Sequence, residues 1–370
     1  MEISEKLWEG RLLPKWAGAC LSIGYKAGLA LRERGYNLGI LKTSPLDIPV
    51  ISIGNLTVGG TGKTPLTMVL GRHLGETYKV AVVSRGYKRE SPQDPLIVSN
   101  GKEVLASPQE SGDEPYLMAR SLPGVAVVVG SNRYQAAKLA VEQLNTQVVL
   151  LDDGFQNKRI KKDLELLLID AHKGFGNCEV LPAGPLREPL EAARRADLAI
   201  LVKKGDAPVN PRVAEMVKST VPHLPIETVE MGLVGLKRIT EGNLEKALPI
   251  EELKGTRVVA FCGIGNPNSF FRMLEEKGLR VVEKRVFPDH HRYSQKELAA
   301  IVEVQRSLGC PYVVTTAKDA VNLPPPPYPE DLLVAELGIK ALPKRLLEIV
   351  EMCISTYYSP IQQRGEVKRR

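Results

Sequence analysis

Short, uninterrupted apolar runs rich in β-branched residues alternate along this chain with segments of helical periodicity. Uninterrupted apolar strands are typical of parallel sheets buried on both faces, whereas strands with one face in water alternate in polarity. Strands and helices that alternate in this way form βαβ units and predict a doubly wound parallel α/β sheet. The predicted strands span residues 49–54, 80–84, 125–130, 148–151, 164–170 and 198–202, with helices at 64–74 and 132–145 among the segments between them.

A second α/β series begins after a proline-containing stretch of mixed polarity at 208–253. Its predicted strands span 257–262, 279–287, 312–316 and 332–336, and its helices lie near 269–277, 295–308 and 342–353. Ser294 is the expected N-cap of the helix at 295–308, because its hydroxyl can accept a hydrogen bond from a free first-turn amide. We therefore predict an N-terminal helix within 1–40, a larger domain at 41–225, a linker at 226–255 and a smaller α/β domain at 256–370.

A glycine-rich segment, Gly54-Asn-Leu-Thr-Val-Gly-Gly-Thr-Gly-Lys-Thr-Pro65, lies between a predicted strand and a predicted helix. That context is the one a phosphate-binding P-loop requires, because backbone amides and a helix N-terminus together surround phosphate oxygens. Lys63 is expected to reach the β- and γ-phosphates of a nucleotide, and the Thr64 hydroxyl to bind Mg²⁺. The usual pattern has glycine where Thr57 stands, but the glycines before Lys63 still favour nucleotide binding. The expected nucleotide-binding residues are Thr57, Val58, Gly59, Gly60, Thr61, Gly62, Lys63 and Thr64.

The apolar strand predicted at 148–151 ends in two carboxylates, Asp152 and Asp153. In P-loop enzymes an aspartate at the end of such a strand orders Mg²⁺ and its waters. Aspartate often ends a strand, so the pair has little meaning alone. Beside the glycine-rich loop it indicates a magnesium site that includes Thr64.

The N-terminal region is basic and moderately apolar between residues 12 and 31. Its longest uncharged piece, Trp16 to Tyr25, has ten residues, well short of the ~20 that a membrane-spanning helix needs. Between Arg11 and Lys42 there are six basic residues and one acidic residue, Glu33. Such a helix can lie in a membrane interface with its cations on anionic headgroups, or it can pack on the rest of the protein. The residues alone leave these two alternatives open.

The formal net charge of +7 favours anionic partners such as nucleotides and phospholipids. Aromatic residues make up 5% of the chain, which leaves little material for the stacking surfaces that bind single-stranded nucleic acid. We therefore expect no nucleic-acid partner. Five scattered cysteines without a C-x-x-C pair predict neither a zinc site nor a disulfide framework, and they fit a reducing cytoplasm.

Further sequence blocks stand in the order found in one known family. They are Ser84-Arg-Gly-Tyr87, Gly112-Asp-Glu-Pro115, Gly130-Ser-Asn-Arg133, Leu151-Asp-Asp-Gly-Phe-Gln156, Leu181-Pro-Ala-Gly-Pro-Leu-Arg-Glu188, Phe287-Pro-Asp-His-His291 and Thr315-Thr-Ala-Lys-Asp319. With these blocks, the chain resembles the tetraacyldisaccharide 4′-kinases of lipid A synthesis from its N-terminal helix to about Cys353. The loop of that family also has a non-glycine residue where Thr57 stands.

The resemblance implies an enzyme that transfers the γ-phosphate of ATP to the 4′-hydroxyl of tetraacyldisaccharide 1-phosphate, giving lipid IVA. It implies ATP and Mg²⁺ as cofactors, with the lipid A disaccharide precursor and an anionic membrane surface as partners. It also implies a P-loop domain and a smaller α/β domain joined by a β-ribbon. The N-terminal helix would then hold the protein on the cytoplasmic face of the inner membrane.

For catalysis, the resemblance implies a dyad of Asp113 and His290 acting beside Lys63. A carboxylate next to an imidazole orients the ring and raises its basicity, which suits proton removal from a sugar hydroxyl. Glu114 is a further candidate for binding Mg²⁺. From the residues alone, Asp113 could instead cap a helix, and His290 could lie in a surface loop. The candidates for holding a phosphate of the acceptor or nucleotide are Arg85, Arg133 and Arg187, for which a surface ion pair is the alternative.

A second class of protein shares part of this pattern, namely soluble P-loop ATPases and GTPases that act as switches or metallochaperones. Such a protein would share the loop and the Asp152-Asp153 pair, but it would not need a basic N-terminal helix or the block Asp289-His290-His291. A GTPase usually carries an Asn/Thr-Lys-x-Asp block that reads the guanine base. Because Thr316-Ala-Lys-Asp319 comes close to that block, the alternative stays open.

Overall fold

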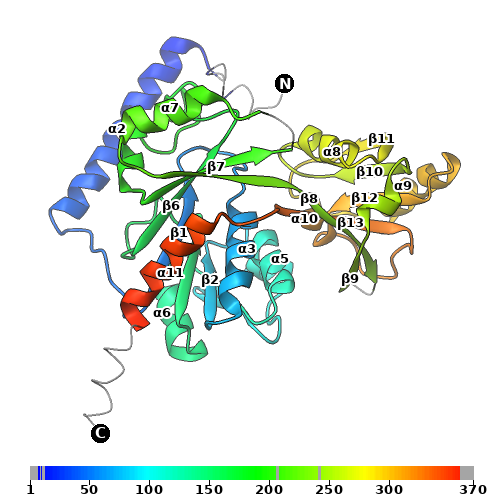
Figure 1. Cartoon of the computed structure of the whole chain (residues 1–370), viewed down its shortest axis with the longest axis horizontal. Helices are drawn as coiled ribbons and strands as arrows, with labels where there is room; N and C mark the ends of the chain where they lie inside the picture. Colours follow the sequence, from blue (N-terminus) through cyan, green and yellow to red (C-terminus); the bar gives the residue numbers. More distant parts are fainter. Residues whose placement is uncertain (1–6, 9, 11–12, 206–207, 241–242, 359–370) are drawn as a thin grey trace, which may run out of the picture.

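The computed structural model describes residues 7–8, 10, 13–205, 208–240 and 243–358, and its central feature is one continuous sheet (Figure 1). The strands follow the order β11-β10-β12-β13-β8-β7-β6-β1-β5-β2-β4-β3, and β9 pairs with β8 off that path. We call strands β1 to β7 with their helices the large lobe, and strands β10 to β13 with their helices the small lobe. The fold is therefore a mixed α/β sheet rather than two separate parallel sheets.

The large lobe contains all the strands predicted for the first α/β series. Its strands are parallel except β3, which lies antiparallel at the edge beside β4. The pattern did not predict β3, because an edge strand that ends in Ser99 and Asn100 has no long apolar run. The strands are β1 Val50–Asn55, β2 Val80–Ser84, β3 Leu96–Asn100, β4 Ala126–Val129, β5 Val148–Asp152, β6 Leu164–Asp170 and β7 Leu198–Lys204.

Helices cover both faces of the large lobe, as the doubly wound prediction requires. Successive residues of a strand point to opposite faces, so Leu150 of β5 packs with α3 while Val149 and Leu151 pack with α6. One face carries α3 Lys63–Gly75, the short α4 Pro108–Ser111 and α5 Asp113–Ser121. The other carries α6 Arg133–Leu144, the 3₁₀ helix η1 Leu190–Arg195 and α7 Pro211–Thr220.

The small lobe repeats the same layering on a smaller scale. Its strands are β10 Arg257–Cys262, β11 Arg280–Val286, β12 Tyr312–Thr316 and β13 Leu332–Ile339. Its helices are η2 Ile250–Leu253, α8 Pro267–Glu276, α9 Gln295–Ser307 and α10 Ala317–Ala320. Ser294 caps α9 as predicted, in a capping box in which its hydroxyl accepts from the Glu297 amide and the Glu297 carboxylate accepts from the Ser294 amide.

The two lobes are joined by β8 Ile226–Thr240, a strand of 15 residues that Figure 1 shows crossing the molecule. Its first part pairs in parallel with β7, and its second part pairs antiparallel with β13. The strand β9 Asn243–Leu248 then returns along β8 as an antiparallel hairpin. The segment predicted as a linker is thus the strand that makes the sheet continuous, with a β-ribbon at its end.

The last helix, α11 Lys344–Tyr358, differs in position from the sequence-based division. That division assigns it to the smaller domain at 256–370. In the structure its buried residues Leu346, Val350 and Ile354 join the core of the large lobe, and Tyr358 donates a hydrogen bond to the Gln147 carbonyl at 2.7 Å. The domain boundaries stay a prediction, but this packing favours moving α11 to the large lobe.

The N-terminal helix α2, Lys15–Asn37, lies along the large lobe with one side packed and the other open. On the packed side, Ser22 donates to the Val180 carbonyl at 3.0 Å and Tyr25 to the Arg187 carbonyl at 2.8 Å. On the open side, Trp16, Ile23 and Leu31 are 74%, 68% and 72% exposed. The packing alternative therefore describes one side of this helix, and the membrane-interface alternative stays a prediction for the exposed side. Of the predicted basic cluster, Arg11 lies outside the described residues, as do residues 1–6 and 359–370 of the predicted domains.

In the ranges that the structure describes, no helix combines the length and apolar character needed to cross a bilayer.

Candidate functional site

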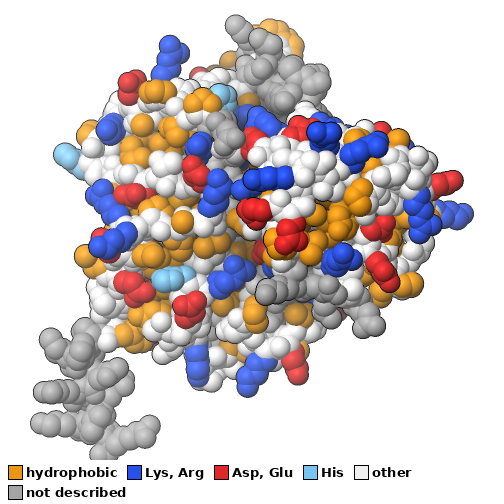
Figure 2. All heavy atoms as spheres, turned by 45° about the vertical axis from the view of Figure 1, so that its right-hand side comes forward, with side chains coloured by type: hydrophobic (Ala, Val, Ile, Leu, Met, Phe, Trp, Pro, Cys, Tyr) orange, Lys and Arg blue, Asp and Glu red, His pale blue; other side chains and the backbone are white. Residues whose placement is uncertain are grey.

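A large cleft of about 2020 Å³ lies between the two lobes. Its lining includes the glycine-rich loop of the large lobe and the segment around His290 of the small lobe. Seen in Figure 2, acidic and basic side chains gather where the small lobe meets the large lobe. The residues predicted for catalysis and nucleotide binding therefore border one space, although they are distant in sequence.

The glycine-rich loop connects β1 to α3, as the sequence predicts for a P-loop. Gly59 and Gly62 have φ of 100° and 91°, a left-handed backbone that residues with a Cβ rarely adopt. A Cβ on Gly62 would also lie 3.2 Å from a methyl group of Val202. Gly62 is the N-cap of α3, so the first-turn amides of that helix lie at the glycine-rich loop, where it lines the cleft.

Lys63, the first residue of α3, is held by groups from two neighbouring strands. Its ammonium donates to Asn55 Oδ1 at 3.1 Å and lies 3.6 Å from Asp153 Oδ1. Arg187 donates to the same carboxylate at 2.8 Å. Burial acts against ionisation of Asp153, but these two cations outweigh it and lower the pKa of its carboxyl. In this arrangement Asp153 positions cations, whereas we predicted it as a metal ligand.

Three oxygen-bearing side chains converge next to the glycine-rich loop, at the start of α3. The Thr64 hydroxyl lies 3.3 Å from Asp152 Oδ2 and 3.5 Å from Glu114 Oε2. Thr67 donates to the other Asp152 oxygen at 3.1 Å, so the carboxylate is fixed against α3. Burial, followed by the charges of Glu114 and Asp153, raises the pKa of Asp152 to about 7. A cation would relieve this concentration of negative charge.

The donor set fits a small, hard cation. Mg²⁺ prefers oxygen ligands and usually takes one or two carboxylates, with waters and substrate phosphates completing its octahedron. Thr64, Asp152 and Glu114 supply such oxygens next to the loop. Among the described residues, no group of three or more His, Cys, Asp or Glu side chains is spaced to hold a metal alone. The arrangement thus suits a cation that is shared with a bound nucleotide.

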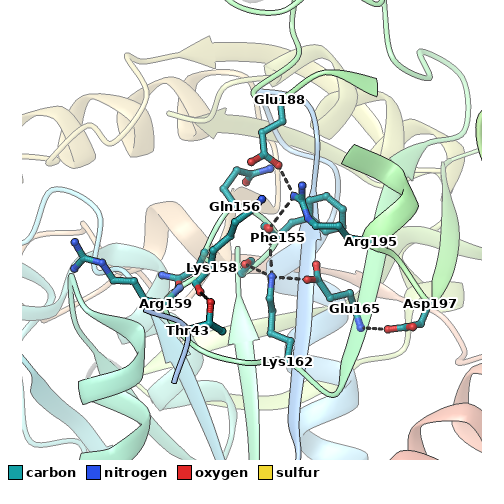
Figure 3. A network of polar contacts seen from close by, with 12 residues as sticks. Thr43, Phe155, Gln156, Lys158, Arg159, Lys162, Glu165, Glu188, Arg195 and Asp197 are labelled. Carbon is teal, nitrogen blue, oxygen red and sulfur yellow. Dashed lines mark hydrogen bonds and ion pairs between the residues drawn. The ribbon is translucent and has the colours of Figure 1, made fainter. Parts of the chain in front are cut away.

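The turn after β5 is braced by a buried polar network, which Figure 3 shows. Lys162 and Arg195 both donate to the Phe155 carbonyl, at 3.4 and 3.3 Å, and the Arg195 guanidinium lies 4.6 Å from the Phe155 ring centre. Lys162 pairs with Glu165, and Arg195 pairs with Glu188. Through Glu165 this network ties the turn after Asp152 and Asp153 to β6, and through Glu188 it ties that turn to the segment that carries Arg187.

Asp113 and His290 meet across the cleft, as the family resemblance implies. His290 Nδ1 and Asp113 Oδ2 are 2.8 Å apart, and both side chains are largely buried. Burial would raise the pKa of Asp113, but hydrogen bonds from His290 and Asn322 outweigh it and lower the pKa. His290 has φ of 66°, a conformation that few non-glycine residues adopt and that often marks functional sites.

The neighbouring histidine points elsewhere. His291 Nε2 lies 3.0 Å from Glu297 Oε1, and its ring stacks on Phe287 with centroids 4.9 Å apart. On the far side of His290, Lys318 Nζ is 3.4 Å from Nε2 and donates to Asp289 at 2.9 Å. The two adjacent histidines therefore have different surroundings, and only His290 contacts Asp113.

The three predicted phosphate-binding arginines differ in availability. Arg187 is engaged with Asp153. Arg133 is 6% exposed, donates to the Gly130 carbonyl at 2.8 Å and has an Nε with no partner among the described residues; burial lowers its pKa to about 10. Arg85 is exposed and lines the cleft. All three arginines line the cleft.

Asp319, the last residue of the block that resembles a guanine reader, is buried and occupied. Its Oδ1 accepts from the Gly263 amide at 2.7 Å and from the Tyr293 hydroxyl at 2.8 Å. Its Oδ2 accepts from Thr316. A guanine-reading aspartate must offer both oxygens to the base, so this geometry argues against the GTPase alternative.

Several residues around the site were not predicted as functional. Asn55 contacts Lys63, and Gln156 contacts Arg187. Both residues lie inside the sequence blocks shared with the kinase family, and that position is a signal of a role at the site. Lys204, which donates to the Gly60 carbonyl at 2.6 Å, and Asn322, which contacts Asp113, stand in no pattern. Only the folded structure brings them to the site.

Residues 14–353 match the model of the tetraacyldisaccharide-1-P 4′-kinases. The chain belongs to this family. The match covers both lobes and α2, so the resemblance seen in the sequence blocks is confirmed along nearly the whole chain.

Individual relatives agree with this assignment. A tetraacyldisaccharide 4′-kinase of Pelobacter propionicus is 44% identical over 294 residues, which cover 79% of each protein. The enzyme of the same name from Halothermothrix orenii is 39% identical over 309 residues, or 80% of each. A crystal structure of LpxK from Aquifex aeolicus in complex with ATP superposes with a TM-score of 0.73 at 32% identity, covering 92% of this chain and 99% of that one.

Proposed function

We propose that this member of the family transfers the γ-phosphate of ATP to the 4′-hydroxyl of tetraacyldisaccharide 1-phosphate, giving lipid IVA. The observation that carries the proposal is the Asp113–His290 pair, which faces the glycine-rich loop across one cleft. A phosphoryl donor on the loop and a hydroxyl beside the pair would meet in that cleft. The kinase names of the relatives and the ATP bound to the Aquifex aeolicus protein support the same reaction.

Phosphoryl transfer needs alignment and charge neutralisation more than covalent help from the protein. The loop amides from Thr57 to Thr64 would surround the phosphates, and Lys63 would neutralise charge on the transferring group. The proton of the 4′-hydroxyl passes to the Asp113–His290 pair while its oxygen bonds to the γ-phosphorus. The bond from that phosphorus to the bridging oxygen breaks, and ADP leaves with the electron pair.

Thr64, Asp152 and Glu114 would hold Mg²⁺, which when bound neutralises phosphate charge next to the loop. Asp153 would act through Lys63 and Arg187 instead, because it already pairs with both. Arg85 and Arg133 are the remaining candidates for a phosphate of the acceptor or nucleotide. Of these, Arg133 has a buried Nε that no described residue contacts through a hydrogen bond, which favours a bound anion.

The proposal predicts transfer of radiolabelled phosphate from ATP to purified tetraacyldisaccharide 1-phosphate. GTP should be a much poorer donor, because both carboxylate oxygens of Asp319 already accept hydrogen bonds within the small lobe. The measurement compares initial rates with the two nucleotides at equal concentration. Hydrolysis of either nucleotide without label in the lipid would instead support the ATPase or GTPase alternative.

The open side of α2 supports a place on an anionic membrane surface at the cytoplasmic face. Trp16, Ile23 and Leu31 share one stripe of the helix at spacings of seven and eight residues, and the following segment exposes Leu38 and Ile40 by 74% each. A stripe of this kind beside an excess of basic residues is typical of helices that lie in the interface. We propose that α2 binds the membrane through this stripe while its other side holds the large lobe at the lipid surface.

Changing Trp16, Ile23 and Leu31 together to glutamate should move the protein from vesicle-bound to soluble at moderate salt. The stripe would lose its apolar area and gain charge that anionic headgroups repel. Co-sedimentation with vesicles that contain anionic lipid measures the effect. The matched control changes three exposed apolar residues elsewhere, Val104, Leu105 and Met352, to glutamate. Equal binding by both variants would leave α2 as a packing helix only.

A further inference from the structure

Asp113 receives a second hydrogen bond from the small lobe, besides the one from His290. Asn322 Nδ2 donates to Asp113 Oδ2 at 2.8 Å, the same oxygen that lies 2.8 Å from His290 Nδ1. The two donors come from separate segments of the small lobe, one before α9 and one after α10. No hydrogen bond from the described residues reaches Oδ1 of Asp113, which is the other oxygen of the carboxylate.

Asn322 is itself rigidly placed. Its backbone N–H donates to the Asp319 backbone carbonyl at 2.9 Å, and its backbone carbonyl accepts from the Tyr293 backbone N–H at 3.0 Å. The buried Asp319 carboxylate also binds the Gly263 amide and the Tyr293 hydroxyl. The Gly263 backbone carbonyl in turn accepts from the His290 backbone N–H at 3.3 Å. The Asp319 carboxylate therefore supports both segments that contact Asp113, the one with His290 and the one with Asn322.

A carboxylate held by one hydrogen bond can still rotate, because the terminal torsion of an aspartate side chain is broad. Two donors on one oxygen, from different directions and a common rigid support, restrict that rotation. The plane of the carboxylate is then set by the small lobe, and Oδ1 is the oxygen left for a ligand in the cleft. Such restraint matters because small errors in the placement of a reacting group cost rate.

We propose that Asn322 is a positioning residue for phosphoryl transfer, which fixes the Asp113 carboxylate so that Oδ1 faces the acceptor hydroxyl. The proposal rests on the proposed kinase function and extends it to a residue outside every recognised sequence block. Asn322 acts through Asp113 and touches neither the P-loop nor the magnesium ligands. Its effect is therefore confined to kcat and does not extend to nucleotide affinity.

A double-mutant cycle tests this role. With Asp113 present, Asn322→Ala should lower kcat by about 10- to 100-fold, the range for losing a hydrogen bond to a charged group, and should leave the KM for ATP unchanged. In an Asp113→Ala background the same substitution should change kcat by less than about twofold, because the carboxylate it orients is gone. A role in stability alone would lower activity equally in both backgrounds.

Two further variants make the result decisive. Gln295→Ala is the matched control, because Gln295 also donates an amide hydrogen bond in this region, to the Pro325 carbonyl at 2.7 Å, but does not touch Asp113; it should retain wild-type kcat. Asn322→Asp keeps the side-chain size and replaces the donor with a like charge, so it should lose at least as much activity as Asn322→Ala.

The outcomes separate this inference from the proposed function. Wild-type protein that fails to label tetraacyldisaccharide 1-phosphate would overturn the function. Active wild type with kcat of Asn322→Ala and Asn322→Asp within about twofold of it, or equal losses in both Asp113 backgrounds, would overturn the role of Asn322 alone. If Asn322→Ala proves unstable by thermal melting, the Asn322→Asp variant decides in its place.

Discussion

Replacing Lys63 with alanine is expected to lower kcat by about 10²–10³-fold, the scale for removing one key group that stabilises transition-state charge. Lys63 is the first residue of α3, directly after the glycine-rich loop. Its ammonium contacts Asn55 and Asp153 at the edge of the cleft. Without it, the transferring phosphoryl group would lose the cation that follows the glycine-rich loop. Phosphate transfer to tetraacyldisaccharide 1-phosphate at saturating ATP measures the effect.

Two further variants serve as controls for the loss of activity in Lys63→Ala. Lys138→Ala removes an exposed lysine of α6 that pairs with Glu142, far from the proposed chemistry, and should keep full activity. Lys63→Arg keeps the charge but not the compact ammonium, so it should restore little activity. Activity of Lys63→Ala within about twofold of wild type would contradict the assignment of the P-loop.

The second large effect is expected at the pair across the cleft. Asp113→Ala or His290→Ala should each lower kcat by about 10²–10⁴-fold, the usual range for a positioned acid or base. The KM for ATP should stay nearly unchanged, because neither side chain is placed to hold the nucleotide. The double variant should be little worse than the poorer single variant, since residues that perform one step together show non-additive losses.

His291 is the internal control for the pair. It follows His290 directly, but its ring packs on Phe287 and its Nε2 meets Glu297 at the capping box of α9. His291→Ala should therefore cost much less kcat than His290→Ala, and its main effect should be on thermal stability. Additive losses at Asp113 and His290, or a larger loss of kcat at His291, would show that the base is assigned wrongly.

Much of the fold follows from local patterns. Strands such as β5 and β10 are short apolar segments. A short segment that is apolar on both faces is typical of a buried parallel strand, so its sequence alone predicts this structure. The glycine-rich turn between β1 and α3 and the cap at Ser294 are equally local, because each depends on residues within one turn of the helix it begins. These features need no knowledge of distant contacts, and the structure has them where they were predicted.

Other features depend on pairings that no local pattern contains. β8 has a mixed polarity because its two halves have different neighbours, β7 on one side and β13 on the other, so it resembles a linker in sequence. α11 has an ordinary amphipathic pattern that predicts a helix but not the lobe that receives its apolar face. The packing partner is chosen by the chain that surrounds it.

The candidate site divides in the same way. The sequence by itself predicted the candidates at the glycine-rich loop, because Lys63, Thr64 and the glycines must be adjacent to surround phosphate. Family resemblance, not spacing, linked Asp113 to His290, which are 177 residues apart. Only the tertiary structure decided that Asp152 faces Thr64 while Asp153 faces Lys63 and Arg187, and that Asn322, 209 residues from Asp113, shares its carboxylate. The contact between Asn322 and Asp113 exists because β8 pairs with both β7 and β13 and so joins the two lobes around one cleft. Its energy depends on the distance between side chains that are far apart in sequence, and no local pattern contains that distance.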